Sequence, residues 1–211
     1  MKKIYIYSVF LFLLTMYGCT HEVTIRPDLE VTTPIASQLD FKVGLYIPPE
    51  LKNLIMSDQA TSADKYVFNV GHSVSSIIQK ACIRTFSYVE ALEAYPTEAL
   101  ALEKNLDFFV LAKISEANVG LNVQEGFLQY NAKGTCQITA ILVFLEKNLN
   151  QFASITSTGT GMRSEPMGTF SSGKDEFAVP VEIAIKNLGN NIVQQIYGNY
   201  DLRKRAEQKG K

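Results

Sequence analysis

The pattern of apolar and polar residues predicts a strand followed by a helix at the start of the globular part of the chain. Apolar residues alternate with polar or small ones from Phe41 to Ile47, which is the period of a half-buried strand. Pro48 and Pro49 end this strand, because proline cannot donate to a strand ladder. Residues 50–66 form a polar segment with room for a short helix. Apolar residues then recur at helical spacing from Val70 to Ala81, which predicts a helix of about 15 residues.

The rest of the domain continues with strands and ends in a helix. Period-2 patterns and apolar runs predict strands at 86–91, 106–118, 130–145 and 152–163, and a short helix at about 96–104. Glycine and polar residues predict turns at Gly120, Asn122 and Gly126, a hairpin turn at 147–150 and a loop at 164–174. An apolar stripe from Val181 to Ile196 predicts a closing amphipathic helix.

This order of elements predicts the fold class. Strands and helices alternate at first, and the later strands follow one another as a meander. We expect one α+β domain, built as a single mixed, largely antiparallel sheet with two longer helices packed on one face. The length of 211 residues agrees with one such domain plus appendages.

The N-terminus has the pattern of a secretory signal peptide. Lys2 and Lys3 form a basic start, and the apolar run from Ile4 to Leu14 is too short for the ~20 residues that span a bilayer as a helix. We therefore predict a signal peptide at residues 1–18. The alternatives are a buried core helix and a short membrane span.

The end of this segment predicts a lipid anchor. Gly18 and Cys19 resemble the lipobox of bacterial lipoproteins, in which a small residue precedes the cysteine that is lipidated and becomes the mature N-terminus. The resemblance implies that acyl chains such as palmitate are attached to Cys19, and several chains on one residue hold a protein stably on a membrane. Thr20 stands where inner-membrane retention typically uses Asp, so the resemblance implies the outer membrane, facing the periplasm. The alternative is an incidental cysteine beside an ordinary cleavage site.

Proline spacing and charge divide the remaining chain. Residues 19–39 are predicted to be the lipidated cysteine and an extended tether, because Pro27 and Pro34 interrupt a polar segment without a persistent period. Residues 40–200 form the predicted periplasmic α+β domain. Residues 201–211 are predicted to be a charged tail, for which a solvated terminus and contact with anionic lipid are the two interpretations.

Composition excludes several classes of function. The formal net charge of −1 lacks the basic surplus of most nucleic-acid binders, so we expect no nucleic-acid partner. Two histidines and three cysteines without a CxxC motif leave too few ligands for a paired zinc module, so we expect no metal and no cofactor.

The stretch from Leu106 to Glu207 resembles one family of envelope lipoproteins. A strand leads into Glu116-Ala117-Asn118-Val119, the next strand starts with Tyr130-Asn131-Ala132-Lys133, and a meander, a Gly/Ser-rich turn, a closing helix and a basic tail follow. This order is similar to that of the YajG family of bacterial envelope lipoproteins. The resemblance implies a periplasm-facing, lipid-anchored domain whose biochemical role is largely undefined, and it supplies no catalytic residues.

Two cysteines of the domain form a candidate disulfide. Cys82 borders the apolar stripe of the first long helix, and Cys136 lies on the strand face that we expect to meet this helix. The oxidising periplasm permits a disulfide, which would close a loop of about 54 residues. The alternative is two independent buried thiols.

Candidate catalytic residues are few. His72 lies near Ser73, Ser75 and Ser76 at the start of the first long helix, but no third residue that would orient a nucleophile–base pair is evident. Gly159-Thr160-Gly161 lacks the following Lys-Ser/Thr of a phosphate loop. We therefore predict that the protein is not an enzyme.

These observations lead to a first hypothesis and two alternatives. The first is a lipid-anchored adaptor or accessory subunit that binds another protein of the cell envelope. The second is a lipid-handling auxiliary lipoprotein of an envelope ABC-type transporter, with Phe108–Leu111 and Ile141–Leu145 lining an apolar groove. An envelope hydrolase is the third.

Overall fold

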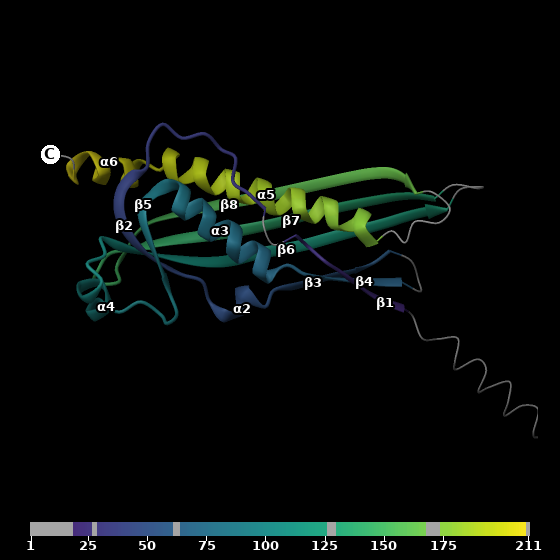
Figure 1. The fold of residues 1–211 in the computed structure, drawn as a ribbon, viewed down its shortest axis with the longest axis horizontal. Helices are drawn as coiled ribbons and strands as arrows, with labels where there is room; N and C mark the ends of the chain where they lie inside the picture. The colour runs from purple at the N-terminus through teal and green to yellow at the C-terminus, as the bar shows by residue number, and fades with distance from the viewer. Residues whose placement is uncertain (1–18, 27–28, 61–63, 126–129, 168–173, 210–211) are drawn as a thin grey trace, which may run out of the picture.

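The computed structural model describes residues 19–26, 29–60, 64–125, 130–167 and 174–209. The predicted signal peptide at 1–18 and the predicted turn residue Gly126 lie outside these ranges. The elements are β1 (Cys19–Val23), β2 (Leu39–Tyr46), α2 (Pro49–Lys52), β3 (Ile55–Gln59), β4 (Asp64–Asn69), α3 (Gly71–Thr85), β5 (Phe86–Leu92), α4 (Glu98–Glu103), β6 (Phe108–Glu125), β7 (Tyr130–Leu145), β8 (Gln151–Met167), α5 (Lys174–Gly198) and α6 (Tyr200–Lys209) (Figure 1).

The larger sheet has five strands in the order β5-β2-β6-β7-β8. β2 is parallel to both of its neighbours, β5 and β6. Parallel strands need a crossover connection; the one from β2 to β5 contains α3, and the one from β5 to β6 contains α4. β6, β7 and β8 are antiparallel neighbours. The turn between β7 and β8 contains Leu149 at a positive φ of 66°. The predicted α+β class is therefore correct, and this sheet is mixed.

The prediction of a single sheet is wrong. A second sheet of three strands has the order β1-β4-β3, with β1 parallel and β3 antiparallel to β4. β3 and the first half of β4 lie in the segment 50–66 that was expected to be a polar excursion. Only Met56, Tyr66 and Phe68 are buried in β3 and β4, so the apolar period there is too short to stand out from the sequence.

The two sheets meet beside β6. β3 lies next to β6, and the backbone N–H of Leu121 donates to Asp58 Oδ2 at 2.7 Å. The turn predicted at Gly120 and Asn122 is also wrong, because both residues continue β6 opposite Thr135 and Lys133. Pairing along the whole hairpin outweighs the local turn preference of Gly and Asn. β8 likewise extends to residue 167 into the predicted loop.

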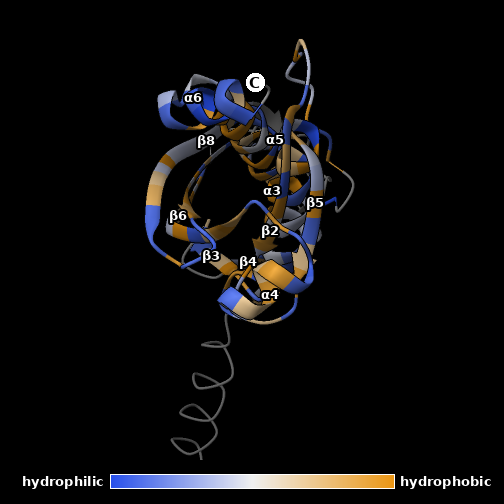
Figure 2. Ribbon diagram, turned by 90° about the vertical axis from the view of Figure 1, so that its left-hand side faces the viewer, coloured by the Kyte–Doolittle hydropathy of each residue, from blue (hydrophilic) through white to orange (hydrophobic). Residues whose placement is uncertain are grey.

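The main core lies between the larger sheet and the two long helices. α3 and α5 pack against each other, and α5 covers β8 and β7. α4 lies on the other side of the sheet, over a smaller core that includes Phe109, Leu111 and Ala101. Because neighbouring β6 residues alternate between the two cores, the sheet is covered on both faces here. Figure 2 shows α3 and α4 on the two sides of β2.

The C-terminal segment that was predicted to be a charged tail contains α6. Leu202 of α6 is fully buried in the main core. The Arg205 guanidinium lies 3.9 Å from the centre of the Phe152 ring, and Lys209 Nζ lies 2.7 Å from Asp107 Oδ2. These contacts join α6 to the end of the larger sheet near the start of β6.

Candidate functional site

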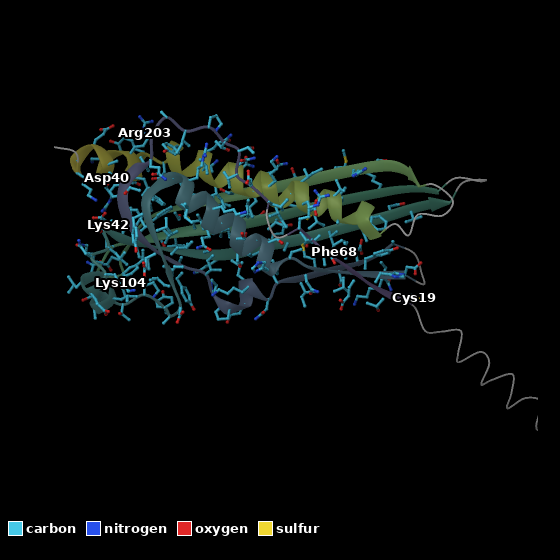
Figure 3. All side chains as sticks on the ribbon, viewed as in Figure 1. Cys19, Asp40, Lys42, Phe68, Lys104 and Arg203 are labelled. Carbon is cyan, nitrogen blue, oxygen red and sulfur yellow. The ribbon has the colours of Figure 1, made fainter. Side chains whose placement is uncertain are left out.

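Cys19, the predicted lipidation site, is exposed at the first position of β1. It stands opposite Asp64 in the parallel β1–β4 pair, and His21 Nε2 lies 2.9 Å from Asp64 Oδ1. The His21 ring lies 5.0 Å from that of Tyr66, whose pKa is raised by burial and by the Asp64 charge. Figure 3 places Cys19 at one end of the long axis and Lys104 at the other. Acyl chains on Cys19 would therefore leave the domain at one end.

The chain that follows Cys19 makes contacts with the domain along much of its described length. β1 is paired with β4, and residues 29–38 run along α3 and α5. The backbone N–H of Thr33 donates to Asn190 Oδ1 at 3.0 Å, and Lys80 Nζ donates to the Leu29 carbonyl at 2.8 Å. Strand pairing thus begins at Cys19 itself.

Cys82 and Cys136 are two separate thiols in the structure. Cys82 lies on α3 and Cys136 on β7, and both face the main core. Burial raises the pKa of each thiol to about 12, so neither carries thiolate character at neutral pH. The disulfide between them stays a prediction from the sequence.

A cavity of about 360 Å³ lies between α3 and the carboxyl ends of β2 and β5. Side chains from four positions on one face of α3 line it, because residues three and four apart are neighbours on a helix. These four are His72, Ser75, Ser76 and Gln79. Lys52 at the end of α2 also lines the cavity, and the apolar lining residues are Leu45, Ile47, Ala91 and Leu92.

Ser75 is the most buried polar residue of this cavity. It is 9% exposed, and among the described residues its Oγ has no hydrogen-bond partner. His72 has no hydrogen bond to Ser73, Ser75 or Ser76 within the described part of the chain, and Ser73 Oγ instead donates to the Arg26 carbonyl at 3.2 Å. The structure thus gathers three of these four candidate residues at one cavity, but not as a hydrogen-bonded nucleophile and base.

The sequence did not indicate Lys52 and Gln79 as functional residues. Lys52 is the last residue of the short helix α2, in a polar segment without a distinctive motif, and Gln79 is one of several polar residues on an amphipathic helix. The helical spacing from His72 to Gln79 was the available signal. Within the described ranges, no group of three or more His, Cys, Asp or Glu side chains is placed to hold a metal ion.

Gly159 and Gly161 lie where α5 contacts β8. A Cβ atom at Gly161 would lie 1.9 Å from the Pro180 carbonyl oxygen, so only glycine fits this close approach. Asn187 Nδ2 donates to the Thr160 carbonyl at 2.8 Å, and Asn191 Nδ2 donates to the Thr158 carbonyl at 2.7 Å. The Gly159-Thr160-Gly161 segment is therefore the place where α5 packs closely against β8.

The apolar segments considered for a lipid groove are covered by the protein's own elements. Phe108 and Val110 face the main core, and Phe109 and Leu111 face the core under α4. On β7, Leu142 is fully buried, and Val143 is half-buried against the smaller core. Neither segment contributes a residue to the cavity of about 360 Å³.

Exposed apolar side chains lie around α4, toward the end of the molecule opposite Cys19 (Figure 3). Leu102 of α4 is 74% exposed, and Tyr95, which precedes α4, is 56% exposed. The Tyr95 ring lies edge-on to Tyr46 at 5.6 Å. The sequence did not indicate these residues as a surface, because two apolar residues seven positions apart in a short helical segment form no distinct pattern.

Across the described residues, no helix has the length and apolarity to cross a membrane.

No protein-family model matches the sequence, and no curated protein matches it. Similar solved structures include a minor lipoprotein of Acinetobacter baumannii (13% identity, TM-score 0.43, covering 77% of this chain and 95% of that chain). A putative neuraminyllactose-binding hemagglutinin homolog of Helicobacter pylori is 9% identical (TM-score 0.45, 86% and 97%). A lipoprotein of Neisseria meningitidis is 13% identical (TM-score 0.32, 75% and 99%). These values assign the chain to none of their families, and the YajG resemblance stays a prediction.

Proposed function

We propose that the protein is a lipid-anchored lipoprotein of the bacterial cell envelope, without enzymatic activity, that acts as an accessory subunit of an envelope assembly. The observation that carries this proposal is the lipobox-like Gly18-Cys19 pair, with Cys19 exposed at one end of the domain. The basic and apolar segment before it has the pattern of a signal peptide. Thr20 supports placement in the outer membrane, facing the periplasm.

Replacing Cys19 by alanine is expected to release the protein from membranes. The acyl chains supply the anchor, because each buried CH₂ adds about 0.8 kcal/mol of membrane affinity and alanine cannot carry them. The measurement is membrane fractionation with metabolic labelling by a palmitate analogue. Cys136→Ala is the matched control, since it removes a buried thiol and should leave label and membrane attachment unchanged. Continued membrane attachment of the Cys19→Ala variant would contradict the anchor.

The anchor position gives the domain an orientation. With Cys19 at the membrane, the end that carries α4 and α6 points toward the periplasm (Figure 1). Leu102 lies on α4 and Tyr95 shortly before it, and large exposed apolar side chains are typical of interaction surfaces. We therefore place the contact with the partner protein around α4.

Site-specific photocrosslinking tests this contact. A photoreactive residue in place of Leu102 is expected to give one dominant crosslinked product in the native envelope, identified by mass spectrometry. The same residue in place of Ile55, which is also an exposed apolar residue, is the control. The second variant Tyr95→Ala should reduce the Leu102 product, because it removes the other large exposed apolar side chain of the proposed surface. Equal products from both crosslinking positions, or none from Leu102, would overturn the assignment of this surface.

A further inference from the structure

The cavity beside α3 has the features of a binding site, and it is independent of the anchor. Its volume of about 360 Å³ lies within the range of small-molecule sites, which are mostly apolar with a few placed polar groups. It also lies outside the carboxyl ends of the parallel strands β2 and β5, where ligands bind in open α/β sheets.

Ser75 provides an observation that points to a ligand. A buried hydroxyl without a hydrogen-bond partner destabilises a folded protein, so such a group calls for a partner. Ser75 Oγ is buried and lacks a partner in the described residues, and the residue lines the cavity. A ligand atom that accepts or donates one hydrogen bond would satisfy it.

The charge of the lining selects the kind of ligand. Lys52 lines the cavity and His72 adds an imidazole, whereas no Asp or Glu is among the lining residues. Both residues are exposed, so they lie at the opening, while Ser75 lies deeper. His72 also lies in the first turn of the 15-residue helix α3, where the helix dipole favours negative charge.

We propose that this cavity binds a small amphipathic anion. Lys52, His72 and Ser75 hold its carboxylate or phosphate group, and its apolar part packs against Leu45, Ile47 and Ala91. Carboxylate and phosphate share the negative charge and the acceptor oxygens that this lining recognises. The apolar strand ends require a hydrocarbon portion, which distinguishes the ligand from a free inorganic ion.

Calorimetric titration of the full-length protein in phosphatidylcholine nanodiscs tests the proposal, with empty nanodiscs as the blank. The probes are hexyl phosphate, hexanoate, hexanol and inorganic phosphate. We expect saturable binding of one or both amphipathic anions at one site, and at least about tenfold weaker binding of hexanol and inorganic phosphate. Stronger binding of hexyl phosphate than of hexanoate identifies a phosphate headgroup, and the reverse order identifies a carboxylate. The proposal would be overturned if hexanol bound as tightly as the amphipathic anions, or if none of the probes showed saturable binding.

Two variants connect the binding to this cavity. Lys52→Gln and Ser75→Ala are each expected to weaken binding of the anion about tenfold. Lys113→Gln removes the same charge from an exposed position of β6 outside the cavity and should leave the affinity unchanged. Ser75→Ala should not lower the midpoint of thermal unfolding, because the hydroxyl has no partner to lose in the described structure. Wild-type affinity in both cavity variants, or an equal loss in Lys113→Gln, contradicts the site.

Discussion

Replacing Gly161 by alanine is expected to lower the free energy of unfolding by about 3 kcal/mol or more. The new Cβ atom would lie 1.9 Å from the Pro180 carbonyl oxygen and 2.8 Å from the Ala184 backbone nitrogen. Both atoms belong to the backbone of α5, so no side-chain rotation relieves the contact and the helix must move away from β8. The hydrogen bonds from Asn187 and Asn191 to β8 would weaken with that movement. Urea denaturation followed by circular dichroism measures the loss.

Gly198→Ala is the matched control for this substitution. Gly198 is the last residue of α5, and nothing lies within 4 Å of an added Cβ atom there. The unfolding free energy of the Gly198→Ala variant should differ from that of the wild type by no more than about 1 kcal/mol in either direction. If Gly161→Ala were as stable as this control, the close contact between α5 and β8 would be wrong.

Phe108→Ala is expected to cost about 3–5 kcal/mol of unfolding free energy. Phe108 is 2% exposed at the start of β6, and its ring makes edge-on contacts with Phe41, Phe86 and Phe152 at centroid distances of 5.1, 5.7 and 5.4 Å. These neighbours come from β2, β5 and β8, so truncation leaves a void where several strands meet. The same denaturation experiment measures this loss.

Tyr200→Ala is the control for the loss of an aromatic ring. Tyr200 begins α6 and is 73% exposed, so its truncation should change the unfolding free energy by about 0.5 kcal/mol or less. A cost for Phe108→Ala close to that of this control would contradict the aromatic cluster as a centre of the core.

Long, regular patterns were sufficient to predict the main elements of the fold. The apolar stripe from Val70 to Ala81 predicted α3, and the alternation from Tyr130 to Leu145 predicted β7 with the bounds that the structure has. The smaller sheet could not be predicted in this way. β1 pairs with β4, and Cys19 stands opposite Asp64, which is distant in sequence. Neither strand has enough apolar positions to indicate its partner.

The candidate sites differ in how far the sequence could predict them. Lipidation of Cys19 could be predicted from the sequence because a lipobox is contiguous, and it stays a prediction. The cavity beside α3 was not found, because its lining comes from α2, α3, β2 and β5 and only the fold brings these together. Ser75 was noted as a residue near the start of a helix, but its lack of a hydrogen-bond partner is a property of the folded packing.

The position of α5 along β8 has a consequence for aggregation. β8 is one of the two edge strands of the larger sheet and is 17 residues long, and long edge strands are templates on which other chains add by strand pairing. Asn187 and Asn191 occupy the carbonyls of Thr160 and Thr158, and the glycines bring the helix backbone against the strand. These two carbonyls already accept hydrogen bonds from α5, which disfavours pairing of a second chain at these positions. The asparagines thus protect this edge of the sheet against the growth of fibres by strand pairing.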